Sequence, residues 1–166
     1  MLKKNINEFN NIYSLFKDNY AILTAGGKSF NSMTVSWGEI GVLWGKDVAT
    51  VFVRPQRYTK EFIDKYDNFT LSFLPLEYKE KVNYFGKASG KDVDKFEKTN
   101  LHPIYDVDFD ATYIGEAMYV LKMKKIYVDK IKPEGFIDSE LMKNYPNSDY
   151  HFVYIGEIKQ FLVNEE

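Results

Sequence analysis

The segment RPQRYT, residues 54–59, contains both arginines of the chain. Of the 22 lysines and arginines in the sequence, 20 are lysine, so Arg54 and Arg57 supply every guanidinium group and stand three residues apart. A guanidinium presents a planar fork of N–H donors that matches the oxygens of a phosphate or a carboxylate. Two roles are therefore open for this pair: binding of an anionic ligand, or a bidentate salt bridge to an Asp or Glu elsewhere in the chain.

Other familiar catalytic motifs are not supported by the sequence. The segment GGKS at 26–29 lacks the first glycine of a phosphate-binding loop, because position 22 is Ile22. His102 and His151 are the two histidines and have no metal-ligand spacing, so each is expected to be an ordinary loop or strand residue. The sequence has no cysteine, which excludes thiol catalysis and iron–sulfur clusters. Any redox chemistry must therefore come from a bound organic cofactor.

Length and composition predict one globular domain spanning residues 1–166. A chain of 166 residues, 45% hydrophobic and 17% aromatic, can close one good-sized core. The net charge of -2 provides no basic field for nucleic acid or an anionic membrane. The N-terminal residues 1–16 lack an apolar signal core, and no apolar run approaches the roughly 20 residues of a membrane span. We expect a cytoplasmic protein with neither nucleic acid nor membrane as a partner.

The secondary structure elements that must position Arg54 and Arg57 are mainly strands. Six segments carry the β-branched and aromatic residues typical of strands, namely 20–27, 30–37, 48–54, 68–74, 116–131 and 150–163. A short helix is predicted from about Thr59, whose hydroxyl would cap it, and two more at 77–86 and 91–99, whereas 102–115 is expected to be irregular. Trp44 is expected in the core. The pattern favours a mainly β protein, a six-stranded antiparallel barrel with short flanking helices.

Three segments in a fixed order carry a family resemblance. NSMTVSW (31–37), RPQRYT (54–59) and SGKDVDKF (89–96), with HFVYIGEI near the end, resemble the flavin reductase-like, FMN-binding split-barrel family, and in particular its flavoredoxin-like branch. The resemblance covers about residues 19–158. It implies a homodimer of six-stranded split barrels that binds FMN non-covalently at the subunit interface and moves electrons between NAD(P)H and flavin.

The chemistry of FMN then suggests a role for each segment. The phosphate suits the two arginines, the Thr59 hydroxyl and the free N–H groups of a helix start. The polar groups of NSMTVSW could hold the pyrimidine edge and the ribityl chain, with Trp37 near the ring; the alternative is a strand that turns them to solvent. Asp92, Asp94 and Lys95 are expected on the polar face of a helix, and no catalytic or metal-binding side chain is expected. The candidate cofactor-binding residues are Asn31, Ser32, Met33, Thr34, Ser36, Trp37, Arg54, Gln56, Arg57, Tyr58, Thr59, Lys87, Ala88, Ser89 and Gly90.

The implied reaction makes few demands on side chains. Hydride passes from nicotinamide to flavin when the rings stack, so the protein supplies binding and orientation. The leading hypothesis is an FMN-dependent NAD(P)H oxidoreductase. One alternative is a non-enzymatic FMN-binding electron carrier or sensor without an NAD(P)H site. Another is a barrel that binds haem or another planar ligand, against which the phosphate-suited arginines argue.

Overall fold

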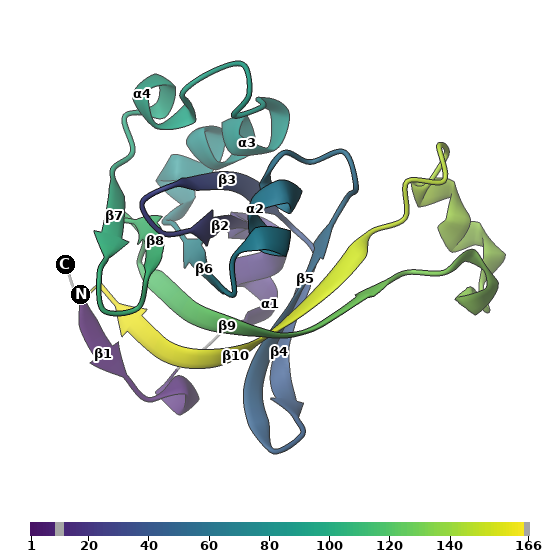
Figure 1. Ribbon diagram of the computed structural model, residues 1–166, viewed down its shortest axis with the longest axis horizontal. Helices are drawn as coiled ribbons and strands as arrows, with labels where there is room; N and C mark the ends of the chain where they lie inside the picture. Colours follow the sequence, from purple (N-terminus) through teal and green to yellow (C-terminus); the bar gives the residue numbers. More distant parts are fainter. Residues whose placement is uncertain (9–11, 165–166) are drawn as a thin grey trace.

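Strands dominate the computed structural model, which describes residues 1–8 and 12–164. Residues 9–11 and 165–166 lie outside the described residues. All five belong to the predicted domain 1–166, and 9–11 also belong to the N-terminal segment. The single-domain organisation stays a prediction. One sheet has eight strands and a second has two (Figure 1). The large sheet contains β1 (Leu2–Lys4), β2 (Ala21–Gly26), β3 (Phe30–Val35), β4 (Gly38–Leu43), β5 (Lys46–Val53), β6 (Asn68–Phe73), β9 (Tyr119–Lys130) and β10 (Phe152–Val163), and the small sheet β7 (Pro103–Asp106) and β8 (Ala111–Ile114).

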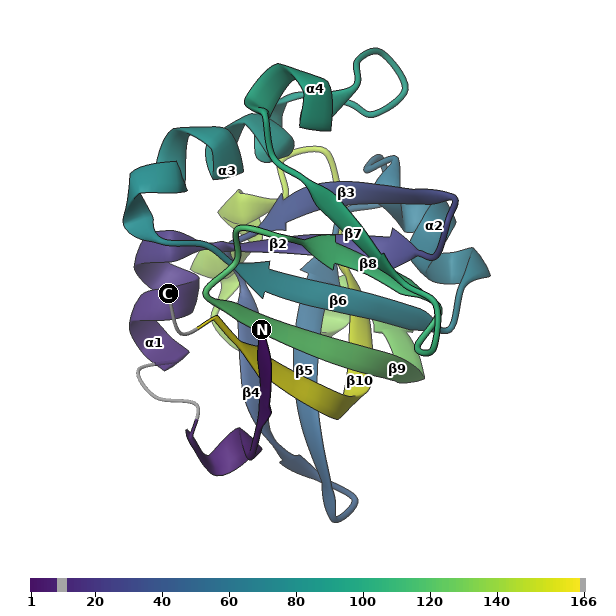
Figure 2. The same cartoon turned by 90° about the vertical axis from the view of Figure 1, so that its left-hand side faces the viewer.

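The large sheet is antiparallel throughout and curls into an open barrel. Its order is β3-β2-β6-β9-β10-β5-β4, with β1 on the other part of β10, and Figure 2 shows this succession from β3 to β10. The register between β9 and β10 shifts at Ile155/Gly156 and at Ile158/Gln160. Such bulges bend a strand and increase its twist. At Gly156 the ring of Phe69 and the terminal methyl group of Met123 come so close that a Cβ would collide with them. Glycine at this position therefore allows these side chains to pack against the backbone of β10.

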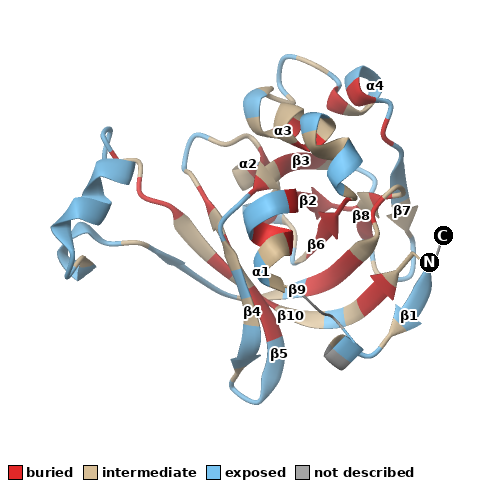
Figure 3. Cartoon of the chain, turned by 180° about the vertical axis from the view of Figure 1, so that it is seen from behind, coloured by how far each residue is buried: buried red, intermediate tan, exposed pale blue. Residues whose placement is uncertain are grey.

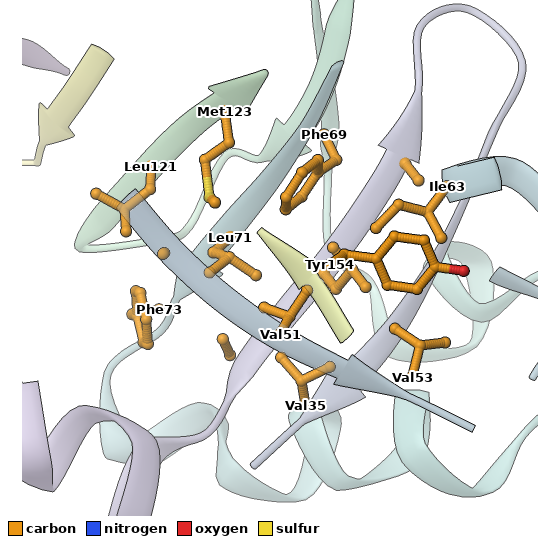
Figure 4. Packing of buried hydrophobic residues seen from close by; sticks show 14 of the residues in the cluster. Val35, Val51, Val53, Ile63, Phe69, Leu71, Phe73, Leu121, Met123 and Tyr154 are labelled. Atoms are coloured by element: carbon orange, nitrogen blue, oxygen red, sulfur yellow. The ribbon is translucent and has the colours of Figure 1, made fainter. Parts of the chain in front are cut away.

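The barrel interior is filled by apolar side chains from every main strand. Figure 4 shows this cluster, which includes Leu71, Val51 and Phe73 among the fully enclosed side chains. Tyr154 reaches through the cluster toward α2, where its hydroxyl donates to Asp64 Oδ1 at 2.5 Å. A second apolar cluster, which includes Phe85, packs α3 against the outside of the barrel. The helices near the barrel are therefore fixed by buried contacts.

Short helices connect the strands and cover one side of the barrel. The helix α2 packs against β2 and β3, and α3 packs against β3. Between β9 and β10, residues 131–151 form an arm that projects away from the barrel in Figure 1 and is largely exposed in Figure 3. No helix in the described part of the chain is long and apolar enough to cross a membrane; the cytoplasmic location stays a prediction. The helical elements are η1 (Ile6–Glu8), α1 (Ile12–Ser14), η2 (Leu15–Asn19), α2 (Thr59–Lys65), η3 (Leu76–Tyr78), α3 (Lys79–Lys87), α4 (Lys95–Thr99), η4 (Pro133–Gly135) and η5 (Ser139–Asn144).

The predicted mainly β, antiparallel barrel class is confirmed, while four strands were not anticipated. They are β1, β4 and the β7–β8 hairpin, which occupies most of the region expected to be irregular. β4 lies at the sheet edge and has little buried surface, so its sequence has no alternating apolar pattern. The core assignment of Trp44 is wrong: its side chain is 62% exposed. Trp44 and Gly45 both have positive φ and form the two-residue turn between β4 and β5, which carries the indole away from the core.

Candidate functional site

A pocket of about 190 Å³ lies where α2 begins and where the chain leaves α3. We call it the loop pocket. Among the described residues, its lining contains three cationic side chains and no carboxylate. Every lining residue except Lys95 belongs to the set predicted from the sequence. The lining residues are Asn31, Gln56, Arg57, Tyr58, Thr59, Lys87, Ala88, Ser89, Gly90 and Lys95.

Arg57 faces the loop pocket without a carboxylate partner among the described residues. Its Nη1 donates to the carbonyl oxygen of Gly86 at 2.6 Å and its Nη2 to that of Phe85 at 3.1 Å. These carbonyls belong to the last turn of α3, which carries a partial negative charge and so favours a cation. Burial lowers the pKa of Arg57, although a guanidinium still remains protonated in a protein. The salt-bridge alternative therefore does not describe Arg57 in this structure.

Lys95 is a site residue that the sequence analysis missed. It was expected on the polar outer face of a helix, but it is only 4% exposed and its Nζ donates to the carbonyl oxygen of Ser32 at 2.5 Å. The cause is the helix start: Asp94 caps α4 through its Oδ1, which makes Lys95 the first helical residue and turns it onto β3. Burial, followed by the positive charge of Arg57, lowers the pKa of Lys95 to about 8. A buried lysine and a half-buried arginine thus meet at one pocket.

Asn31 and Thr59 line the same pocket and bind each other. Asn31 Nδ2 donates to Thr59 Oγ1 at 2.8 Å, and both residues are buried. The predicted capping role of Thr59 is wrong, because Thr59 is itself the first residue of α2 and the preceding Tyr58 makes no side-chain cap. Since Thr59 Oγ1 accepts from Asn31, its hydroxyl hydrogen remains available for an acceptor in the pocket. Gly90 presses against the Asn31 amide so closely that a Cβ would collide with it.

A second pocket, of about 260 Å³, lies at the end of β3. We call it the strand pocket. Arg57 borders both pockets, so they are adjacent. Ser32 lines neither of them: its hydroxyl pairs with Thr24 Oγ1 at 2.8 Å on the buried outer face of β2 and β3. The strand pocket is lined by Met33, Thr34, Val35, Ser36, Trp37, Phe52, Arg54, Arg57 and His151.

Arg54 holds the arm against the barrel. Its Nη1 donates to Asp149 Oδ2 at 2.5 Å and its Nη2 to the carbonyl oxygen of Asn144 at 2.8 Å. Gln56 also donates to Asp149 Oδ2, at 2.8 Å, and the hydrogen bonds from Gln56 and Arg54 lower the pKa of Asp149. The two arginines thus have different surroundings: Arg54 makes the salt bridge that the sequence left open, whereas Arg57 faces the loop pocket.

His151 is the second residue whose place the sequence analysis did not foresee. It is buried on the wall of the strand pocket, where its ring centroid lies 5.0 Å from that of Trp37. Burial, and then the charge of Arg54, lowers its pKa to about 4. The one signal in the sequence was its position at the head of HFVYIGEI. No group of three or more His, Cys, Asp or Glu side chains within the described ranges is arranged to hold a metal ion.

The open antiparallel barrel, with two adjacent pockets beside β3, has the architecture of a split barrel. The chain belongs to the flavin reductase-like family: the family model described as "Flavin reductase like domain" matches residues 13–166. This family membership confirms the resemblance found in the sequence. No curated protein sequence matches the chain significantly.

Solved structures show the same fold at low sequence identity. Flavoredoxin of Desulfovibrio vulgaris (Miyazaki F) is 23% identical with a TM-score of 0.69, over 99% of this chain and 78% of that one. An FMN-binding protein from Thermus thermophilus, with bound p-hydroxybenzaldehyde, is 17% identical with a TM-score of 0.68, over 99% and 82%. An NADH:FAD oxidoreductase from Streptomyces globisporus is 15% identical with a TM-score of 0.66, over 99% and 87%.

Proposed function

We propose that this protein binds FMN, with the phosphate in the loop pocket and the ring in the strand pocket, and uses it to transfer electrons from NADH or NADPH. The observation that carries the proposal is the meeting of Arg57 and Lys95 at a pocket to which no described carboxylate contributes. Buried cations are unfavourable unless they are paired. A phosphate dianion supplies the missing charge.

The remaining groups of the loop pocket fit the same ligand. The Thr59 hydroxyl keeps a hydrogen to donate, Lys87 adds a third cation, and residues 88–90 bring small side chains and backbone to the pocket. The helix α2 is seven residues long, and Lys60 and Glu61 already donate their N–H groups to Arg57 and Tyr58. The anion site therefore depends more on side chains than the sequence suggested. A ligand that ends in one phosphate matches this arrangement, which favours FMN over FAD.

The strand pocket suits the flat part of the ligand. Trp37 is partly exposed there and can pack against an aromatic ring, while His151 and Phe52 provide further walls. When bound, flavin supplies the hydride-accepting chemistry. Trp37 also borders an adjacent cavity of about 730 Å³, which offers room beside the ring for a second planar molecule such as nicotinamide. The protein side chains then bind and orient, and none needs to transfer a proton.

We also propose that the protein is a homodimer. Large apolar side chains are exposed on the β4–β5 hairpin (Val42 and Trp44), on β9 (Tyr127 and Val128) and on the arm (Ile137). These elements extend from the barrel on the side away from β7 and β8 (Figure 1). A second copy could cover them and the open mouth of the strand pocket, as the family resemblance implies.

The absorption spectrum of the purified protein tests the function. After reconstitution with FMN, anaerobic addition of NADH or NADPH should bleach the yellow colour. Bleaching by dithionite alone would instead support the electron carrier or sensor. Release of the flavin by denaturation, followed by chromatography, distinguishes FMN from FAD. Failure to bind either flavin would overturn the proposal.

A further inference from the structure

The arm places Tyr145 against His151, which lines the strand pocket. The Tyr145 hydroxyl lies 2.9 Å from His151 Nδ1, and the two rings meet edge to face with their centroids 5.4 Å apart. Both residues are buried. Arg54 stacks on the Tyr145 ring at 5.1 Å from its centroid while holding Asp149 of the same arm. Tyr145 is thus fixed from two directions.

The direction of this hydrogen bond follows from the two groups. A phenol is a good donor and a poor acceptor, whereas an unprotonated imidazole nitrogen is a good acceptor. Burial keeps His151 neutral, with Arg54 opposing its protonation and Asp149 favouring it; Arg57 borders the same pocket. The Tyr145 hydroxyl therefore donates to Nδ1, and the ring hydrogen of His151 resides on Nε2.

The Nε2 atom of His151 is not fully enclosed, and His151 lines the strand pocket. No described residue makes a hydrogen bond to Nε2. Asp149 Oδ1 is the one side-chain nitrogen or oxygen of the described residues that is fully enclosed without a partner, so the unpartnered Nε2 must have some exposed surface. Since His151 lines the strand pocket, its free N–H has that space to reach a ligand.

We propose that Tyr145 is a positioning residue that holds neutral His151 with its Nε2–H toward the strand pocket, where this N–H donates to the ligand atom that gains electron density on reduction. The identity of that ligand rests on the proposed function. A fixed donor at a site of developing negative charge stabilises the reduced form more than the oxidised form. Tyr145 and His151 would thus set the reduction potential of the bound ligand.

Nitrogen-15 NMR of the ligand-free protein tests the positioning directly. The chain has two histidines, and exposed His102 serves as an internal reference. In the wild type His151 should carry its hydrogen on Nε2. In Tyr145→Phe this preference should weaken by roughly threefold to tenfold, the scale of one neutral hydrogen bond. Tyr150→Phe is the matched control, because Tyr150 is also buried and packs on Tyr145. A hydrogen on Nδ1 in the wild type, or an unchanged preference in Tyr145→Phe, overturns the proposal.

The potential of bound FMN tests the consequence. Reduced FMN should lose roughly threefold to tenfold more affinity than oxidised FMN in Tyr145→Phe, and Tyr150→Phe should leave the ratio unchanged. His151→Gln, whose amide can replace the donor, should restore part of the potential that His151→Phe loses. If FMN binds but its reduction potential is the same in the wild type and in these variants, Tyr145 does not position His151 for the ligand. If FMN does not bind even to the wild type, the proposed function itself fails.

Discussion

Lys95 and Arg57 lie on one pocket, close enough for the charge of Arg57 to help lower the pKa of Lys95 to about 8. Neither has a carboxylate partner in the described part of the chain. Folding thus brings two like charges together, one buried and one half-buried, which is unfavourable until an anion binds. The assignment of the loop pocket to a phosphate can therefore be tested by changing the geometry of Arg57, the charge of Lys95 or the pH.

The first prediction concerns the geometry with which Arg57 binds FMN. Arg57→Lys keeps the charge but loses the planar group whose remaining N–H donors can reach a phosphate while Nη1 and Nη2 hold the α3 carbonyls. FMN binding should therefore weaken by about 1.5–3 kcal/mol, the scale of hydrogen bonds to charged groups. Riboflavin lacks the phosphate, so its binding should hardly change. Fluorescence titration with both flavins measures this. Equal losses for the two flavins would contradict the phosphate role.

Arg54→Lys provides the comparison. Because Arg54 holds Asp149 and Asn144 of the arm, this change should lower the melting temperature of the apo protein and affect FMN and riboflavin alike.

The pH dependence of Lys95 is the second prediction. Its pKa is lowered from 10.5 to about 8 in the folded protein, so the unfolded chain binds more protons between these values. The free energy of unfolding contributed by Lys95 therefore rises with pH across this window. FMN favours the protonated amine, so FMN affinity should fall as pH rises through about 8. Titrations of FMN and riboflavin from neutral to alkaline pH measure the difference.

Lys95→Met is the control for this pH effect. It should remove the pH-dependent difference between the two flavins above neutrality while leaving riboflavin affinity nearly unchanged. A difference that persists in Lys95→Met would assign the titration to another group.

The contact between Gly90 and Asn31 gives the third prediction. In Gly90→Ala the new methyl group would collide with the Asn31 amide, so either the loop or the Asn31–Thr59 hydrogen bond must move. Overpacking of this kind costs about 1–3 kcal/mol, and FMN affinity should fall with it. Gly41→Ala is the matched control, because nothing lies within 4 Å of the added Cβ. Unchanged FMN binding in Gly90→Ala would show that the loop does not shape the pocket.

Assembly is the fourth prediction. Light scattering at micromolar protein should give the mass of a dimer, and a double change of Val42 and Trp44 to Glu should give a monomer because it places charges on the exposed apolar hairpin. Val107→Glu alters an equally exposed residue of the β7–β8 turn, far from the hairpin in Figure 1, and should leave the dimer intact. Monomeric wild type would contradict the proposal.

The sequence by itself determined the features that depend on neighbouring residues. The alternation of 150–163 predicts β10, and the spacing of Phe62, Ile63 and Tyr66 predicts the helix that begins at Thr59; both elements are confirmed. The order of NSMTVSW, RPQRYT and SGKDVDKF was sufficient to indicate the family, which the family model confirms. Edge strand β4 was missed because a strand with little buried surface has no apolar period to detect.

Tertiary structure alone decided which side chains meet. Arg54 pairs with Asp149, 95 residues later in the chain, whereas Arg57 faces the loop pocket, although both belong to one short motif. Lys95 turns inward because β3 lies beside the start of α4 and offers it the Ser32 carbonyl, 63 residues earlier. Local periodicity describes a helix or strand but contains no information on what packs against it. The difference between a solvated charge and a buried one is therefore set by the fold.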